Sequence, residues 1–173
     1  MTQLEAVIRS AVAALADAGA SFALIGGLAV SVRTEPRFTR DADLVVAVPD
    51  DGEAERVVNH LRAAGFGIAT LVEQNATGRL ATVRLMPIVS QDGAVIDLLF
   101  ASSGVEQEIV DAADPIEILP SLVIPVAQTG HLIALKLLSR DDVERPLDLA
   151  DLRVLLRQAS PSDHALARSA IAL

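Results

Sequence analysis

The segment IGGLAVSVRTEPRFTRDADLVVAV, residues 25–48, constrains the fold more than any other part of the chain. One apolar run ends in Gly26-Gly27, and a second apolar run opens at Asp43 after a polar connection. A strand that ends in glycines and enters a helix presents backbone N–H groups that can bind an anion closely. The segment therefore predicts a strand, a glycine turn, a short helix to about Arg33, and a second strand that lies inside a sheet.

Paired carboxylates open the second of these strands. Asp41 and Asp43 are separated by one residue, so in an extended segment both side chains point to the same face. Mg²⁺ is commonly held by one or two carboxylates together with substrate phosphates. Asp97 lies in another apolar run, GAVIDLLFA, and joins the pair if that strand is adjacent. Three such carboxylates could hold two metal ions for an in-line phosphoryl transfer.

Each of these features also has a purely structural interpretation. Gly26-Gly27 can be a plain turn, Asp41 can cap a strand, and Asp97 can lie on an exposed edge. The arginines near the carboxylates can offset the local acid in a solvated loop, or they can bind a triphosphate or an acceptor backbone. These arginines are Arg33, Arg37 and Arg40, with Arg79 and Arg84 extending the same set.

The rest of the chain divides into an α/β portion and a helical portion. Helices are predicted at 2–18, 50–64, 129–139, 147–158 and 162–171, with a helical turn at 106–111. Further strands are predicted at 68–72, 80–88, 94–100, 116–119 and 122–126, with a hairpin turn at Gln91-Asp92-Gly93. We therefore expect an α+β fold with a mixed sheet, a core over residues 1–126, and a helical portion over 127–173 packed on it as one body.

Composition limits the classes of function. The net charge is −9, so any contact with nucleic acid must be local, and the absence of Tyr and Trp disfavours a base-stacking platform. The absence of cysteine removes disulfides and thiolate chemistry. No apolar run has the length of a membrane span, and the N-terminus lacks a basic segment before an apolar one, so we expect no signal peptide, no membrane association and a cytoplasmic location.

Lys136 is the single lysine among 14 basic residues. Because the other basic residues are all arginine, the single lysine indicates a position where arginine cannot substitute. A compact ammonium and a planar guanidinium are not interchangeable. The alternative is a lysine whose stem lies along the core edge. Asp148 and Asp151 are three residues apart and share one helical face, where they can serve the site, the helix dipole, or a surface pair with Arg145.

The order of these motifs carries a resemblance. Gly26-Gly27, then Asp41-Ala42-Asp43, then a separate strand Asp resembles the nucleotidyltransferase superfamily of the polymerase β type. The tail GHLIALKLLSRDDVERPLDLADLRVLL resembles the AbiEii/MenT-type nucleotidyltransferase toxins, so the similarity spans roughly residues 20–157. Gly27 stands where the commoner motif has serine, which leaves the preferred NTP open.

The resemblance implies a role for each motif. Asp41 and Asp43 would bind Mg²⁺ (or Mn²⁺), and Asp97 would be the third metal-binding carboxylate and activate the acceptor hydroxyl. Lys136 would contact the triphosphate, and Asp148 or Asp151 would position Lys136 or the nucleotide. The remaining nucleotide-binding candidates are Gly26, Gly27, Arg33 and Arg40.

The family transfers a nucleoside monophosphate from an NTP and releases pyrophosphate. In its MenT-like branch the acceptor is RNA, the 3′ end of tRNA, and a cognate antitoxin accompanies the toxin. Two alternatives stay open: transfer to a small molecule or protein hydroxyl, which the low basic content favours, and a non-catalytic nucleotide-binding or antitoxin-like protein. The three aspartates and Lys136 give no sign of a decayed site.

Overall fold

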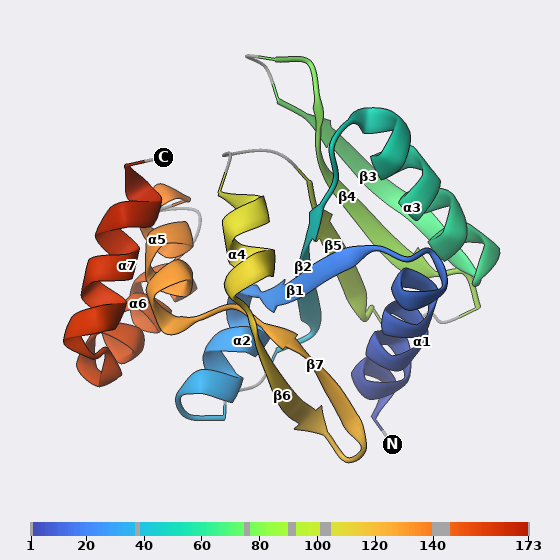
Figure 1. Cartoon of the computed structure of the whole chain (residues 1–173). Coiled ribbons are helices and arrows are strands. Elements are labelled where there is room, and N and C mark those ends of the chain that lie inside the picture. The colour runs from blue at the N-terminus through green and yellow to red at the C-terminus, as the bar shows by residue number, and fades with distance from the viewer. Residues whose placement is uncertain are drawn as a thin grey trace.

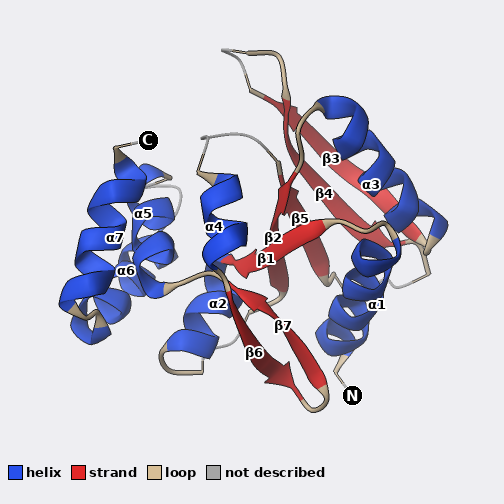
Figure 2. Ribbon diagram, in the orientation of Figure 1, coloured by secondary structure: helices blue, strands red, loops and turns tan. Residues whose placement is uncertain are grey.

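A computed structural model describes residues 2–36, 39–74, 77–89, 93–100, 105–139 and 146–172. Its centre is a seven-stranded mixed sheet with the strand order β3-β4-β5-β2-β1-β7-β6 (Figures 1 and 2). The strands are β1 (Ser21–Ile25), β2 (Asp41–Ala47), β3 (Phe66–Glu73), β4 (Leu80–Pro87), β5 (Val95–Leu99), β6 (Asp114–Leu119) and β7 (Leu122–Val126). The expected α+β class with a mixed sheet is confirmed.

Helices lie on both sides of this sheet. Figure 1 shows α1 and α3 on one side of the central strands, and α2, α4 and the group α5–α7 on the other. The helices are α1 (Gln3–Asp17), α2 (Gly26–Arg33), α3 (Asp51–Ala63), α4 (Glu106–Ala112), α5 (Thr129–Leu138), α6 (Pro146–Gln158) and α7 (Pro161–Ile171). Within the residues described, none of these helices has the length and apolarity needed to span a bilayer.

Strand β2 occupies the centre of the sheet, as its apolar sequence predicts. It pairs antiparallel with β1 and parallel with β5, and Leu44, Val45 and Val46 are at most 1% exposed. The strand begins at Asp41, two residues earlier than the apolar run alone indicates. Both aspartates are therefore held by strand pairing and do not lie in the loop before it.

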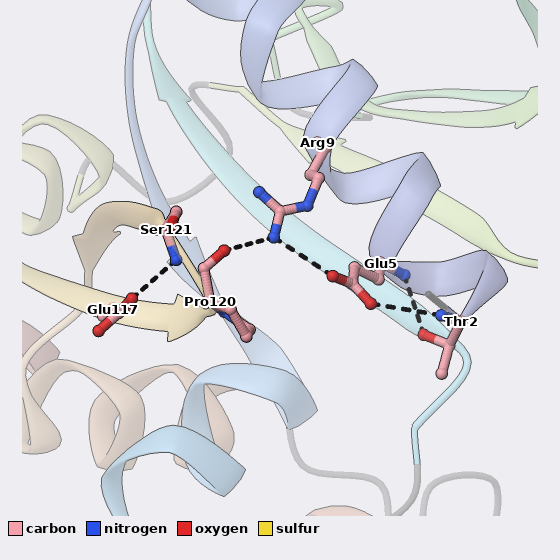
Figure 3. Close-up of polar contacts among 6 residues, drawn as sticks. All are labelled: Thr2, Glu5, Arg9, Glu117, Pro120 and Ser121. Atoms are coloured by element: carbon pink, nitrogen blue, oxygen red, sulfur yellow. Dashed lines mark hydrogen bonds and ion pairs between the residues drawn. The ribbon is translucent and has the colours of Figure 1, made fainter.

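The first helix is tied to the far hairpin by polar contacts (Figure 3). Arg9 Nη2 lies 3.2 Å from Glu5 Oε1 and donates to the Pro120 carbonyl at 2.6 Å. Ser121, at φ 60°, donates its N–H to Glu117 Oε1 across the same β6–β7 turn. The bond from Arg9 to Pro120 links the turn to α1 although the two segments are far apart in sequence.

The last strand of the sheet leads directly into the helix that carries Lys136. Strand β7 ends at Val126, and α5 begins at Thr129. Helix α5 packs against α6, α7 and α2. Strands β4 and β5 pair antiparallel, and a turn is expected between them at residues 91–93; residues 91 and 92 lie outside the described residues, and Gly93 has φ 77°.

Candidate active site

The glycine turn and the paired carboxylates are in direct contact. Gly26 begins α2 with φ 66°, a conformation that L side chains rarely adopt. A Cβ on Gly26 would lie 1.9 Å from Oδ2 and 2.5 Å from Cγ of Asp43. Only glycine therefore allows the Asp43 carboxylate to lie against this turn.

The first turn of α2 is suited to an anion. Its N-cap residue, Ile25, is extended, and within the described chain no side chain caps the helix by a hydrogen bond. The N–H groups of a helix start carry partial positive charge and need acceptors. A phosphate next to Gly26-Gly27 would supply them.

Strand pairing places the three expected aspartates on one face. Asp43 is opposite Asp97 in the parallel β2–β5 pair. Asp41 and Asp43 are both half-buried, whereas Ala42 between them is fully buried on the other face. The neighbouring strand that the sequence requires for Asp97 is thus present.

Asp97 is held by an arginine from its other neighbour. Arg84 is opposite Asp97 in the antiparallel β4–β5 pair, and it donates from Nε to Oδ1 at 2.8 Å and from Nη2 to Oδ2 at 2.7 Å. The hydrogen bonds to Asp97 raise the pKa of Arg84 above its ordinary value, with further contributions from the charges of Asp97, Asp41 and Asp43; burial acts in the opposite direction. The guanidinium therefore lies in the field of all three carboxylates.

The donor chemistry fits a hard divalent cation. Asp41 and Asp43 supply two carboxylates beside the glycine turn, the number that Mg²⁺ commonly takes from a protein. The third carboxylate, that of Asp97, already forms an ion pair with the Arg84 guanidinium. Across the described ranges, however, no three acidic or histidine side chains are arranged to hold one ion, so the expected three-carboxylate set is not assembled.

Lys136 lies in a buried ionic cluster. Its Nζ is 2.5 Å from Asp148 Oδ1 and 3.0 Å from Asp151 Oδ2, and each of the three residues is at most 9% exposed. The sequence left open which of the two aspartates would position Lys136; in the structure both contact its ammonium group. The alternative of a surface pair between Arg145 and this helix falls on a residue outside those described.

A cavity of about 120 Å³ joins the two halves of the site. Gly26 and Asp43 line one part, and Lys136 of α5 and Ser139, the C-cap residue after that helix, line another. The remaining lining is apolar, from Ile25, Leu99, Leu132 and Leu135. The sequence did not indicate Ser139 as a site residue. The feature that could have indicated it is its position about one helical turn after Lys136.

The predicted arginines are distributed differently. Arg40 is exposed and directly precedes Asp41. Arg33 lies at the opposite end of α2 from Gly26, where it donates to Asp114 Oδ2 at 2.7 Å and to backbone carbonyls of β7 and the residue after it. Arg79 lies 3.4 Å from Asp51 of α3, and Arg37 lies outside the described residues. Arg84 is brought to the carboxylates by its two hydrogen bonds to Asp97.

Solved structures share this fold. The crystal structure of ANT(2″)-Ia in complex with adenylyl-2″-tobramycin superposes with a TM-score of 0.61 at 14% identity, covering 99% of this chain and 98% of that one. The lincosamide antibiotic adenylyltransferase LnuA gives 0.56 at 14% identity, with 92% and 99% covered. A putative nucleotidyltransferase from H. pylori gives 0.56 at 17% identity, with 98% and 77% covered.

Sequence comparison identifies the family. No curated protein sequence matches the chain. The family model described as nucleotidyl transferase AbiEii toxin, type IV toxin–antitoxin system, matches residues 10–173. Since that match spans almost the whole chain and includes every element of the site, the chain belongs to the AbiEii nucleotidyl transferase toxin family and is a nucleotidyltransferase.

Proposed function

We propose that the protein transfers a nucleoside monophosphate from an NTP to an RNA acceptor, the 3′ end of tRNA, and releases pyrophosphate. In this proposal it acts in the cytoplasm as the toxin of a pair, and a cognate antitoxin binds it. The observation that carries the proposal is the cavity in which Gly26, Asp43 and Lys136, from three distant parts of the chain, line one space. The family match supports the toxin role.

The chain's own groups have distinct tasks toward the nucleotide. The N–H groups at the start of α2 bind phosphate oxygens, and Lys136, which lines the same cavity, contacts the triphosphate. Asp148 and Asp151 fix the Lys136 ammonium by their contacts at 2.5 and 3.0 Å. Asp41 and Asp43 hold a divalent cation, Mg²⁺ or Mn²⁺, which when bound polarises the phosphoryl oxygens and offsets developing negative charge.

Transfer requires an acceptor hydroxyl to attack the α-phosphorus. A bond forms between the acceptor oxygen and phosphorus, the bond from phosphorus to the pyrophosphate oxygen breaks, and the hydroxyl proton must be accepted by a base. Asp97 is our candidate for that base, since it lies beside Asp43 and lines an open cavity with Thr70, Thr82 and Arg84. The acceptor would enter from that side.

The test is incubation of the purified protein with total tRNA, Mg²⁺ and each α-labelled NTP in turn. We expect label on tRNA with the wild type, and loss of the label with Asp41→Asn. Asp17→Asn removes the same charge at an exposed position at the end of α1, and it should label tRNA like the wild type. Label that persists in Asp41→Asn would contradict the assignment of the carboxylates.

A small-molecule or protein hydroxyl is the second candidate acceptor. The fold is shared with antibiotic adenylyltransferases, and the net charge of −9 does not favour a long polyanion. If tRNA receives no label while the nucleotide still binds, the same assay with small hydroxyl compounds or cell extract in place of tRNA tests this alternative. Label that appears on one of these other acceptors but not on tRNA, and that is lost in Asp41→Asn, would favour this second candidate.

A further inference from the structure

The bidentate pair between Arg84 and Asp97 uses the carboxylate that the proposed chemistry needs. Both Asp97 oxygens accept a hydrogen bond from the guanidinium, at 2.8 and 2.7 Å. A carboxylate held in this way by a cation is a weak base and a poor ligand for a second cation. The proposed role of Asp97 therefore requires that this pair open.

The register of the sheet gives Asp97 two partners on opposite sides. Arg84 of β4 lies directly across from it on one side, and Asp43 of β2 lies directly across on the other. Side chains opposite each other on adjacent strands are close enough to interact. Asp97 thus lies between Arg84 and Asp43 in one row across the sheet.

The two members of the pair differ in their freedom to move. The Asp97 side chain is 10% exposed, whereas that of Arg84 is 47% exposed. Arg84 also lines an open cavity of about 130 Å³ with Thr70, Val72 and Thr82. The guanidinium consequently has both room and solvent into which it can withdraw, while the buried carboxylate stays near the site and needs a counter-charge at all times.

We propose that Arg84 is a positioning residue that takes the place of the divalent cation at Asp97, so that cation binding and the Arg84–Asp97 pair exclude each other. In the metal-free protein Arg84 neutralises Asp97 and keeps it turned from Asp41 and Asp43. Cation binding releases Arg84 toward the open cavity and brings Asp97 to the other two carboxylates. The inference rests on the proposed function in one respect, namely that Asp41 and Asp43 bind a divalent cation.

The experiment measures binding of Mn²⁺ alone to the full chain by water proton relaxation, without nucleotide or acceptor. Arg84→Gln should tighten Mn²⁺ binding about tenfold, because the guanidinium that competes with the cation for both Asp97 oxygens is removed. Arg62→Gln is the matched control: Arg62 is exposed, donates to Asn59 Oδ1, and loses the same charge on α3, which lies on the other side of the central strands from α2 (Figure 1). Its Mn²⁺ affinity should stay within about twofold of the wild type, because exposed charges beyond a Debye length are screened.

A double-mutant cycle separates competition at Asp97 from a general effect of charge. In an Asp97→Asn background, Arg84→Gln should change the Mn²⁺ affinity by about twofold or less, since the shared carboxylate is gone. An equally large change in both backgrounds would show that Arg84 acts only through its charge, and it would overturn the inference. If Arg84→Gln does not fold, as judged by circular dichroism, Arg84→Lys decides: it keeps the charge, cannot make the two-point contact, and should still tighten Mn²⁺ binding.

The outcomes also distinguish this inference from the proposed function. If the wild type binds Mn²⁺ and Arg84→Gln binds it equally well, the inference fails and the cation site at Asp41 and Asp43 stands. If neither protein binds Mn²⁺, the inference fails together with the cation role of those aspartates. Tighter binding in Arg84→Gln that depends on Asp97 supports the exchange.

Discussion

The carboxylate of Asp43 occupies the position that a side chain on residue 26 would fill. A Cβ at Gly26 would approach Asp43 Oδ2 to 1.9 Å, far inside any tolerated contact, and the residue also has φ 66°. One glycine thus satisfies two requirements, a left-handed turn and the close approach of an acidic side chain to the start of a helix. The contact joins the glycine turn and the carboxylate pair into one unit.

The first prediction concerns Gly26→Ala. The added methyl must displace the Asp43 carboxylate, and misplacement of a catalytic group by about 1 Å lowers the transfer rate about 100-fold. The control is Gly78→Ala, because Gly78 has nearly the same φ, 67°, with no atom within 4 Å of its Cβ position. Steady-state nucleotide transfer by the two variants separates the clash from backbone strain; equal rates would contradict the proposed contact.

The second prediction concerns the charge balance around Lys136. Lys136→Met leaves Asp148 and Asp151 buried without their ammonium, which should lower the free energy of unfolding by about 3 kcal/mol. Lys136→Arg keeps a positive charge, so it should be more stable than Lys136→Met while transfer stays impaired, because the larger planar group cannot reproduce the contacts.

Urea denaturation and transfer assays on both variants check this prediction. Asp151→Asn combined with Lys136→Met removes one of the two buried carboxylates and should recover part of the lost stability. If Lys136→Met were as stable as the wild type, the buried cluster would not be an ion pair network of the kind described.

The third prediction concerns the pH dependence of stability at the start of α7. Partial burial opposes ionisation of Asp163, but the net effect of its surroundings is to lower its pKa below the usual 3.8. The pKa is lowered by hydrogen bonds from the side chain and backbone of Ser160 and from the Gly130 backbone, and by the charge of Arg33. A lowered folded-state pKa stabilises the folded chain above the unfolded value, and this contribution disappears as the pH falls through the folded pKa.

Asp163→Asn should therefore lower the free energy of unfolding by about 1 kcal/mol at neutral pH, as for loss of a helix cap. The difference from the wild type should shrink as the pH falls below 3.8, where the wild-type carboxyl gains its proton. Urea denaturation of both proteins at several pH values tests this course. A difference that does not change with pH would show that charge has no part in the effect.

The fourth prediction compares two arginines that the sequence proposed for nucleotide binding. The Arg33 guanidinium donates hydrogen bonds to Asp114 and to the carbonyls of Val126 and Ala127. Loss of these bonds in Arg33→Met should lower the free energy of unfolding by about 2 kcal/mol. The KM for NTP should change little. Arg40 is exposed beside Asp41, so Arg40→Gln should lower stability less than Arg33→Met does, and it should raise the KM.

Denaturation and NTP titration of these two variants form one matched experiment, since each removes one positive charge. A large rise in KM for Arg33→Met without loss of stability would contradict the structural role of Arg33. It would instead place the residue in the nucleotide site, as the sequence pattern indicates.

Local sequence determined most of the secondary structure. The Thr2–Glu5 capping box, the glycine after β1 and the alternation around Asp97 predict elements whose observed ends lie within about two residues, because caps, turns and strand faces depend on near neighbours. The interior position of β2 also followed from its continuous apolar run. The motif order, with Asp41, Asp43 and Lys136, was sufficient to name the nucleotidyltransferase family.

Only the tertiary structure decided which charges meet. The sequence grouped Arg33 with Arg40 by proximity along the chain, yet a helix of 8 residues carries Arg33 away from the carboxylates and onto β6 and β7. It gave Arg84 no defined partner, whereas the register of β4 and β5 puts its guanidinium on Asp97. Pairing between distant strands is set by the sum of many contacts over the sheet, and a local sequence pattern does not predict that sum.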